Sequence, residues 1–223
     1  MKLIIATCFN GKEINPRYVH SLMELTVLLN EMKVEYEFHC TESKEIDKAK
    51  NKIVHEFIKK DFTHIIFIDP DVSWDSRGMA RFLVSVKNGA ELIGGVYPQY
   101  GIYEVNPVME DGCLKGYNTD KYRIIEVSSV NGGFLMYSRK AFDRIAPNME
   151  NYKEITPSED EETIIEFFKS RNGIRKTEDL FFQKNYRDVG GMIFVEPNIT
   201  FNLIGKRNWN GNYNQSLLGV EVI

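Results

Sequence analysis

The feature that most constrains the fold of this chain is a regular alternation of strand and helix patterns in its first half. Strand patterns at residues 3–9, 34–40, 64–68 and 91–97 alternate with amphipathic helical patterns at residues 18–32, 45–60 and 76–87. Such an alternation, with strands that are almost continuously apolar, is typical of a parallel sheet covered by helices. We therefore predict an α/β protein with a mostly parallel central sheet flanked by helices on both faces.

This fold class also predicts where a ligand would bind. Right-handed crossovers place the carboxyl ends of parallel strands along one edge of the sheet, and ligands of open α/β sheets bind at that edge. Residues that directly follow an apolar strand are therefore the first candidates for a functional site.

The second half of the chain is less regular. Residues 99–123 are rich in Gly, Tyr, Asn and Asp and are predicted to form loops or a hairpin, residues 147–162 are predicted to form an acidic loop, and residues 198–223 show no clear period. Between them lie strand patterns at residues 124–130, 134–137, 164–168 and 192–196, and helical patterns at residues 139–145 and 177–187. No repeat or linker is evident, so we predict a single domain over residues 1–223.

Composition excludes several classes of partner. The formal net charge of −4 gives no broad attraction to nucleic acid, so any bound phosphate must be held locally. No segment approaches the roughly 18 apolar residues of a membrane span, so no transmembrane segment is predicted. Three dispersed cysteines, Cys8, Cys40 and Cys113, argue against a disulfide framework and fit a reducing compartment. We expect a soluble protein of the cytoplasm, or of the host cytoplasm if the chain is viral.

The sharpest functional signal is a pair of aspartates that follows the strand pattern at residues 64–68. Asp69 and Asp71 are separated by Pro70, which cannot donate to a sheet and is compatible with a strand that ends there. In extended backbone, residues i and i+2 face the same way, so both carboxylates can converge on one point. Such a pair suits a hard divalent cation that also binds phosphate oxygens. The alternative is that the two acids form a turn and cap the next helix.

A second acidic signal precedes the helical pattern at residues 177–187. Glu178 and Asp179 follow Thr177, which is a plausible N-cap, and acids in a first turn are favoured by the helix dipole. In the functional interpretation, Asp179 is instead a general base that removes a proton from an acceptor hydroxyl. The sequence leaves both interpretations open.

Two further segments could contact a ligand. Asn131, Gly132 and Gly133 lie between two strand patterns and indicate a tight bend or a close approach of the backbone to a ligand. Lys48, Lys50 and Asn51 lie near the start of a helix, one face of which could meet a nucleotide base or phosphate, although lysines on a helix are usually only its solvated face.

Taken in order, these segments resemble a GT-A glycosyltransferase, and most of all the small single-domain enzymes of the family-2 type found in large DNA viruses, phages and some bacteria. The resemblance covers almost the whole chain. Its motifs are Ile4-Ile5-Ala6-Thr7, Lys48-Ala49-Lys50-Asn51, Phe67-Ile68-Asp69-Pro70-Asp71, Gly94-Gly95-Val96-Tyr97-Pro98, Gly133-Phe134-Leu135-Met136, Glu178-Asp179-Leu180-Phe181-Phe182 and Glu196-Pro197-Asn198-Ile199.

The resemblance implies a GT-A fold and a metal-dependent transfer of a sugar from a nucleotide-sugar donor, expected to be a UDP-sugar, to a hydroxyl of a glycan or other acceptor. Asp71 would ligate Mn²⁺ or Mg²⁺, and Asp69 would hold the donor ribose or a metal-bound water. Asp179, with Glu178 beside it, would be the base of an inverting displacement.

The resemblance also implies a nucleotide-sugar pocket. Thr7, Lys48 and Asn51 would line it, together with Gly132 and Gly133.

The chain departs from the family in two places. Lysine stands at positions 48 and 50, where relatives often carry arginine, and Leu203 stands where many GT-A enzymes supply a histidine ligand. We therefore expect the metal to bind weakly without donor.

Two other functions use a similar architecture. A nucleotidyltransferase normally has a Gly-rich, basic first loop, which residues 7–11 do not provide. A non-catalytic carbohydrate-binding protein with a degenerate transferase fold is the other alternative.

Overall fold

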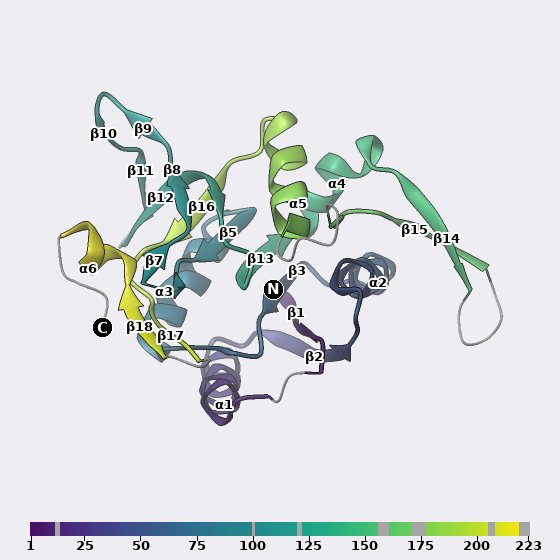
Figure 1. Cartoon of the computed structure of the whole chain (residues 1–223), viewed down its shortest axis with the longest axis horizontal. Coiled ribbons are helices and arrows are strands. Elements are labelled where there is room, and N and C mark those ends of the chain that lie inside the picture. The colour runs from purple at the N-terminus through teal and green to yellow at the C-terminus, as the bar shows by residue number, and fades with distance from the viewer. Residues whose placement is uncertain are drawn as a thin grey trace.

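The computed structural model describes residues 1–11, 14–99, 101–119, 122–155, 161–170, 177–204 and 208–218. At its centre lies a nine-stranded sheet (Figure 1). Eight of the strands lie in the order β11 (Gly116–Thr119), β12 (Tyr122–Val130), β16 (Ile193–Glu196), β5 (Leu92–Gly95), β13 (Phe134–Ser138), β3 (His64–Ile68), β1 (Lys2–Phe9) and β2 (Glu35–Glu42). The ninth strand, β8 (Val105–Pro107), pairs with β12.

Most of the central strands run in one direction. β1 is parallel to both β2 and β3, and β5 is parallel to β16. β13 lies between β3 and β5 and is antiparallel to both, so β3 and β5 share their direction. The predicted mostly parallel sheet is therefore confirmed, with β13 as an antiparallel insertion that the apolar pattern alone does not reveal.

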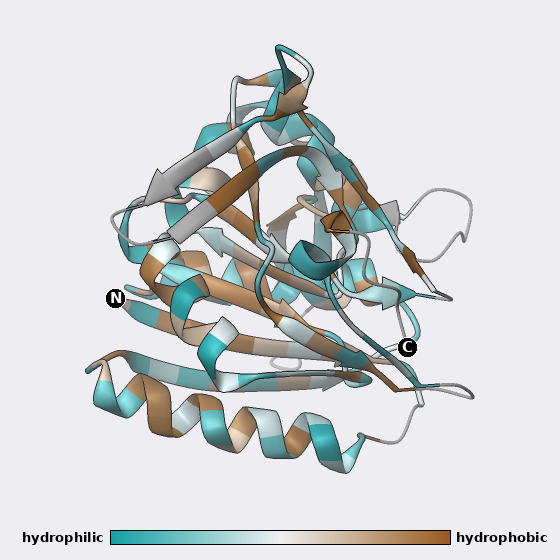
Figure 2. Ribbon diagram, turned by 90° about the vertical axis from the view of Figure 1, so that its left-hand side faces the viewer, coloured by the Kyte–Doolittle hydropathy of each residue, from teal (hydrophilic) through white to brown (hydrophobic). Residues whose placement is uncertain are grey.

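Helices cover both faces of the sheet, as predicted. On one face pack α2 (Ile46–Lys59), α4 (Arg139–Ile145) and α5 (Thr177–Asp188), and on the other pack α1 (Pro16–Glu31) and α3 (Ser76–Lys87) (Figure 1). Successive side chains of β3 point to opposite faces of the sheet. Ile65 and Phe67 join the hydrophobic core under α2, α4 and α5, and Ile66 and Ile68 join the core under α1 and α3. Both faces of the strand are therefore apolar and must be covered by helices. Hydrophobic residues, coloured brown, are frequent along the central strands in Figure 2.

The acidic segment predicted as a loop contains strand at residues 151–155 and 161–162, so the prediction was wrong for these residues. β14 (Asn151–Ile155) and β15 (Glu161–Ile165) pair antiparallel and extend away from the sheet (Figure 1). Ion pairs link the hairpin to α2: Lys52 lies 2.5 Å from Glu154, and Lys59 lies 2.5 Å from Glu162. Four of the ten residues in these two strands are charged, so the strands carry only a weak alternation of apolar residues.

The segment after β5 forms short hairpins, in agreement with its prediction as loops or a hairpin. β6 (Pro98–Gln99) pairs with β7 (Ile102–Tyr103), and β9 (Met109–Glu110) pairs with β10 (Cys113–Leu114). In the part of the chain that the structure describes, no helix is both long enough and apolar enough to cross a membrane.

The C-terminal segment, which shows no clear period in the sequence, is ordered against the end of β3. It forms β17 (Thr200–Leu203), β18 (Trp209–Asn212) and α6 (Tyr213–Leu217), and β17 pairs with β4 (Val72–Trp74) in a three-stranded sheet. Asp75 links the two regions: its Oδ1 accepts from the Gly78 backbone N–H at 2.7 Å, which caps α3, and its Oδ2 accepts from the Thr200 N–H at 2.6 Å. The C-terminal strands therefore border the Asp69–Asp71 turn.

Candidate functional site

Asp69 and Asp71 lie at the carboxyl end of β3, where the fold class predicts a ligand site. The Asp69 backbone N–H donates to the Gly133 carbonyl at 2.9 Å, and the Ile204 N–H donates to the Asp71 carbonyl at 2.8 Å. Both aspartates are half-buried, so their carboxylates are neither fully solvated nor sealed in the core. The turn is thus held from two sides, by the β12–β13 connection and by the residue after β17.

The phenol of Tyr97 interacts electrostatically with the acids of both predicted signals. Tyr97 is fully buried, and burial is the main cause that raises its pKa well above its usual value. The negative charges of Asp69, Asp71 and Asp179 raise that pKa further. All three carboxylates therefore lie close enough to act on one phenol, so the structure gathers both predicted acidic signals in one region.

Gly132 and Gly133 pack closely against two of these acids, Gly132 against Asp179 and Gly133 against Asp69. A Cβ atom on Gly133 would lie 2.0 Å from the Tyr97 hydroxyl oxygen and 2.6 Å from Oδ2 of Asp69, and one on Gly132 would lie 1.9 Å from Oδ2 of Asp179. No real Cβ atom fits at such distances, so the chain needs glycine at both positions. The predicted close backbone approach is present, and it is made to two carboxylates of the protein itself.

Asp179 begins a buried charge cluster at the start of α5. Oδ2 of Asp179 accepts from the ammonium group of Lys50 at 2.6 Å, and Oδ1 accepts from the Tyr137 hydroxyl at 2.9 Å. Oε1 of Glu178 lies 3.2 Å from the same ammonium group. Exposed fractions are only 2% for Asp179, 6% for Glu178 and 4% for Lys50. The predicted N-cap side chain, that of Thr177, lies outside the described residues.

The charge state of Asp179 is set by opposing effects. Burial is the largest and raises its pKa, the ammonium group of Lys50 lowers it, and the charge of Glu178 raises it, which leaves a pKa of about 6. The carboxylate is therefore the main form at neutral pH and is lost as the pH falls through about 6. A group that must accept a proton needs this form.

The other predicted nucleotide contacts have partners within the protein. Lys48 is exposed and pairs with Glu45 at 2.7 Å, so the lysine that the structure brings to the acids is Lys50. Asn51 is buried, and its side-chain amide donates to the Phe168 carbonyl at 2.8 Å and accepts from the Phe168 N–H at 2.9 Å. The structure thus does not bring Lys48 to the predicted acidic residues. Asn51 instead holds the backbone of Phe168 through two hydrogen bonds.

Thr7 lies on β1, and its hydroxyl is 2.5 Å from the hydroxyl of Tyr18. The role of Thr7 in a nucleotide pocket remains a prediction.

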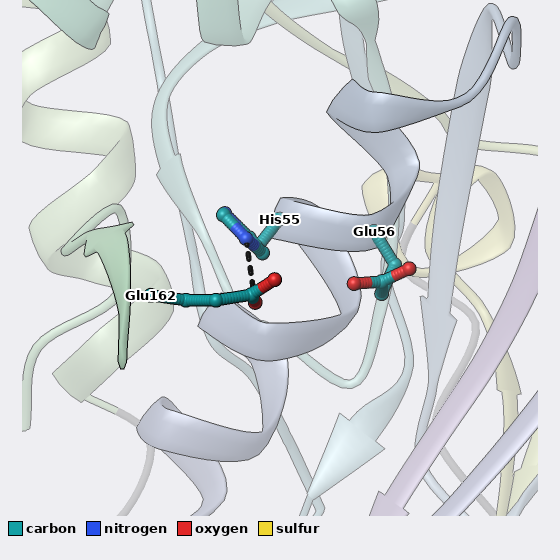
Figure 3. Close-up of side chains that lie close together, drawn as sticks. All are labelled: His55, Glu56 and Glu162. Atoms are coloured by element: carbon teal, nitrogen blue, oxygen red, sulfur yellow. Dashed lines mark hydrogen bonds and ion pairs between the residues drawn. The ribbon is translucent and has the colours of Figure 1, made fainter. Parts of the chain in front are cut away.

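A separate group of possible metal ligands lies on α2 and β15 (Figure 3). It consists of His55, Glu56 and Glu162, and Nε2 of His55 is 3.1 Å from Oε2 of Glu162. Oε1 of Glu162 already lies 2.5 Å from the ammonium group of Lys59, which is also 3.5 Å from Oε1 of Glu56. Because Lys59 supplies the positive charge here, we interpret this group as an ion-pair network that holds the β14–β15 hairpin.

The close packing at Gly132 leads to a first prediction. Gly132→Ala is expected to lower the free energy of unfolding by about 2–3 kcal/mol or more, because the new methyl group overlaps the Asp179 carboxylate and must displace it. Chemical denaturation measures the loss. In an Asp179→Ala background the same change should cost less, since two of the three overlapping atoms are gone; equal costs in the two backgrounds would contradict the geometry.

Comparison with known proteins shows the fold. No protein-family model matches the chain, and no curated protein matches it in sequence. Among solved structures, the crystal structure of A197 from STIV matches with a TM-score of 0.58 and 12% identity over 100% of this chain and 93% of that chain.

Two other solved structures match with lower scores. A Drosophila β-1,4-galactosyltransferase 7 variant with manganese, UDP-Gal and xylobiose matches with a TM-score of 0.48 and 14% identity, over 96% of this chain and 78% of that chain. A glycosyltransferase involved in glycosylation of the major capsid of PBCV-1 matches with a TM-score of 0.37 and 9% identity, over 63% and 61%. The chain has the GT-A fold that its sequence predicts.

Proposed function

We propose that this chain is a metal-dependent glycosyltransferase that moves a sugar from a nucleotide-sugar donor, with a UDP-sugar as the first donor class to test, to a hydroxyl group of a glycan or other acceptor. The observation that supports this proposal most is the gathering of Asp69, Asp71 and Asp179 around Tyr97 at the carboxyl ends of the strands. A GT-A fold supplies the architecture, and these acids supply the groups that such a transfer requires.

The acids at the end of β3 fit a divalent cation. Asp69 and Asp71 offer hard carboxylate oxygens, both are partly accessible, and both act on the same phenol. Glycine at position 133 lets the backbone pack directly against Oδ2 of Asp69, to which a Cβ atom there would come within 2.6 Å. These two residues would hold Mn²⁺ or Mg²⁺. When bound, the ion would offset the negative charge that develops on the departing nucleoside diphosphate.

The transfer itself is a displacement at the anomeric carbon of the donor sugar. The acceptor oxygen forms a bond to that carbon while the bond from the carbon to the diphosphate oxygen breaks, and the nucleoside diphosphate leaves with the bonding electrons. We assign the proton of the acceptor hydroxyl to the Asp179 carboxylate. Because the acceptor oxygen attacks in a single displacement from the side opposite the departing diphosphate, the configuration at the anomeric carbon inverts. Glu178 acts through its charge in the same cluster.

Access to Asp179 requires a movement of the protein. The carboxylate is 2% exposed and lies under Gly132, so an acceptor hydroxyl reaches it only when the connection between β12 and β13 shifts. The same connection receives the hydrogen bond from Asp69 to the Gly133 carbonyl. Binding of metal and donor at Asp69 is therefore expected to be coupled to exposure of the base.

Calorimetry with UDP tests the proposed function before the donor sugar is known. We expect UDP to bind in the presence of Mn²⁺ and much more weakly without it, and Mn²⁺ alone to bind weakly because only Asp69 and Asp71 are assigned to it. A panel of nucleotide sugars, screened by thermal shift and then by transfer or hydrolysis, would identify the donor. A protein that binds glycans but ignores UDP with Mn²⁺ would be the carbohydrate-binding alternative, and the proposal would fail.

A further inference from the structure

Lys50 is an unusual residue because its charged group is almost completely buried. Its ammonium group lies 5.4 Å from the ring centroids of both Phe67 and Phe168, and it is within 3.2 Å of one oxygen each of Glu178 and Asp179. A buried ammonium group is costly unless carboxylates pair with it. Burial acts to lower its pKa, but the charges of Asp179, Glu178 and Asp69 outweigh burial and raise it, so Lys50 is protonated at neutral pH.

The groups that surround Asp179 give Lys50 a specific effect. Tyr137 donates a neutral hydrogen bond from β13, Glu178 adds a negative charge from α5, and Cys8 interacts with Asp179 electrostatically from β1. Of the groups that the described residues place against this carboxylate, Lys50 alone carries a positive charge. Burial and Glu178 both favour the neutral acid, so the ionised form depends mainly on Lys50 and to a smaller extent on the hydrogen bond from Tyr137.

We propose that Lys50 is a positioning residue for the transfer: its buried ammonium group keeps the Asp179 carboxyl ionised and oriented beneath Gly132, ready to accept a proton. The catalytic consequence rests on the proposed function, whereas the effect on Asp179 does not. Lys50 also interacts electrostatically with Asp69. It therefore links the acid assigned to the metal with the acid assigned as base.

The effect on Asp179 can be measured without any substrate. In protein labelled with ¹³C-aspartate, the carboxyl signal that disappears in Asp179→Asn reports the titration of Asp179. We expect Lys50→Met, which keeps a long side chain between the two phenylalanine rings, to raise the titration midpoint by about 1–3 pH units, since an opposite charge is removed. Lys50→Arg should keep the midpoint near that of the unmodified protein.

A second variant gives a shift in the opposite direction and keeps the Lys50–Asp179 pair. Glu178→Gln removes the negative charge that raises the pKa of Asp179, so its midpoint should fall. This variant tests the charge cluster even if Lys50→Met fails to fold. Lys52→Met is the matched control, because Lys52 lies on the same helix but is exposed and pairs with Glu154; it should leave the midpoint unchanged.

Once a donor is found, the rate of transfer gives a second measurement. Lys50→Met should move the acidic limb of the kcat profile to higher pH and lower kcat at pH 7 roughly tenfold, while Lys50→Arg restores the profile. A loss by the same factor at every pH would indicate a merely structural role and overturn the proposal. Unchanged midpoints for Asp179 in both Lys50→Met and Glu178→Gln would also overturn it. If the titration midpoint of Asp179 shifts as expected in both variants but no donor supports transfer, the result contradicts the proposed function and not the role of Lys50 toward Asp179.

Discussion

Replacing Asp71 with asparagine is expected to lower Mn²⁺-dependent transfer about 100-fold or more. Asparagine keeps the size of the side chain and the backbone contact to Ile204, but it removes one of the two carboxylates assigned to the cation. A loss of roughly 3 kcal/mol of stabilisation of the departing diphosphate corresponds to a factor of this size. Initial rates over a range of Mn²⁺ concentrations measure it, and higher Mn²⁺ should restore part of the activity.

A matched control for this variant lies at the opposite end of the same strand. Asp61 precedes β3, is exposed and pairs with Lys2 at 2.5 Å. Asp61→Asn removes a carboxylate from the same strand region without touching the carboxyl edge of the sheet, so rates and Mn²⁺ dependence should stay the same. If Asp71→Asn behaves like Asp61→Asn, the assignment of the metal site to this turn is wrong.

Replacing Asp179 with asparagine is expected to lower kcat by about 10²–10⁴-fold while the affinity for UDP with Mn²⁺ changes little. Asparagine keeps only one acceptor oxygen, so it can hold only one of the two positions where Lys50 and Tyr137 donate, and it cannot take a proton from the acceptor. The pKa of about 6 fixes the sign of the pH dependence in the unmodified protein: kcat should fall as the pH drops through about 6, because the carboxylate is lost. In Asp179→Asn this acidic limb should disappear from the residual rate.

Asp188→Asn provides the control for the helix that carries the base. Asp188 ends α5, is exposed and pairs with Lys184 at 2.5 Å. Its replacement should leave kcat and its pH profile unchanged, because the pair is solvated and contributes little. Thermal unfolding of both variants separates a loss of chemistry from a loss of fold. An Asp179→Asn protein with full activity would show that another group accepts the proton.

Local patterns in the sequence were sufficient to predict the mostly parallel central sheet and the helices that cover it. The apolar run of β3, its end at Asp69, and the helices on both faces follow from residue periodicity, which the chain carries within short windows. The glycines at positions 132 and 133 indicated a tight bend or a close approach to a ligand, and only the structure shows that the close approach is to side chains of the protein itself.

Other features depend on which distant segments meet. β17 pairs with β4, and no residue periodicity within either segment predicts this pairing. β13 runs antiparallel to β3, a direction that its own composition does not indicate. The sequence did not separate Lys48 from Lys50 as possible nucleotide contacts, whereas the packing of α2 exposes Lys48 and buries Lys50 beside Phe67 and Phe168. A charge pattern on a helix does not show which face is covered.

The sequence by itself thus determined the alternation of strands and helices in the first half of the chain and the acids that follow β3 at the carboxyl edge of the sheet. Only the tertiary structure decided that Asp179 is buried, that its oxygens are held by Lys50 and Tyr137, and that Gly132 covers it. The physical reason is that periodicity and turn chemistry act between near neighbours in the chain. The charge state and accessibility of a carboxyl group are instead set by residues that folding brings together from distant positions. For Asp179 these are Tyr137 and Lys50, which lie 42 and 129 residues away in the sequence.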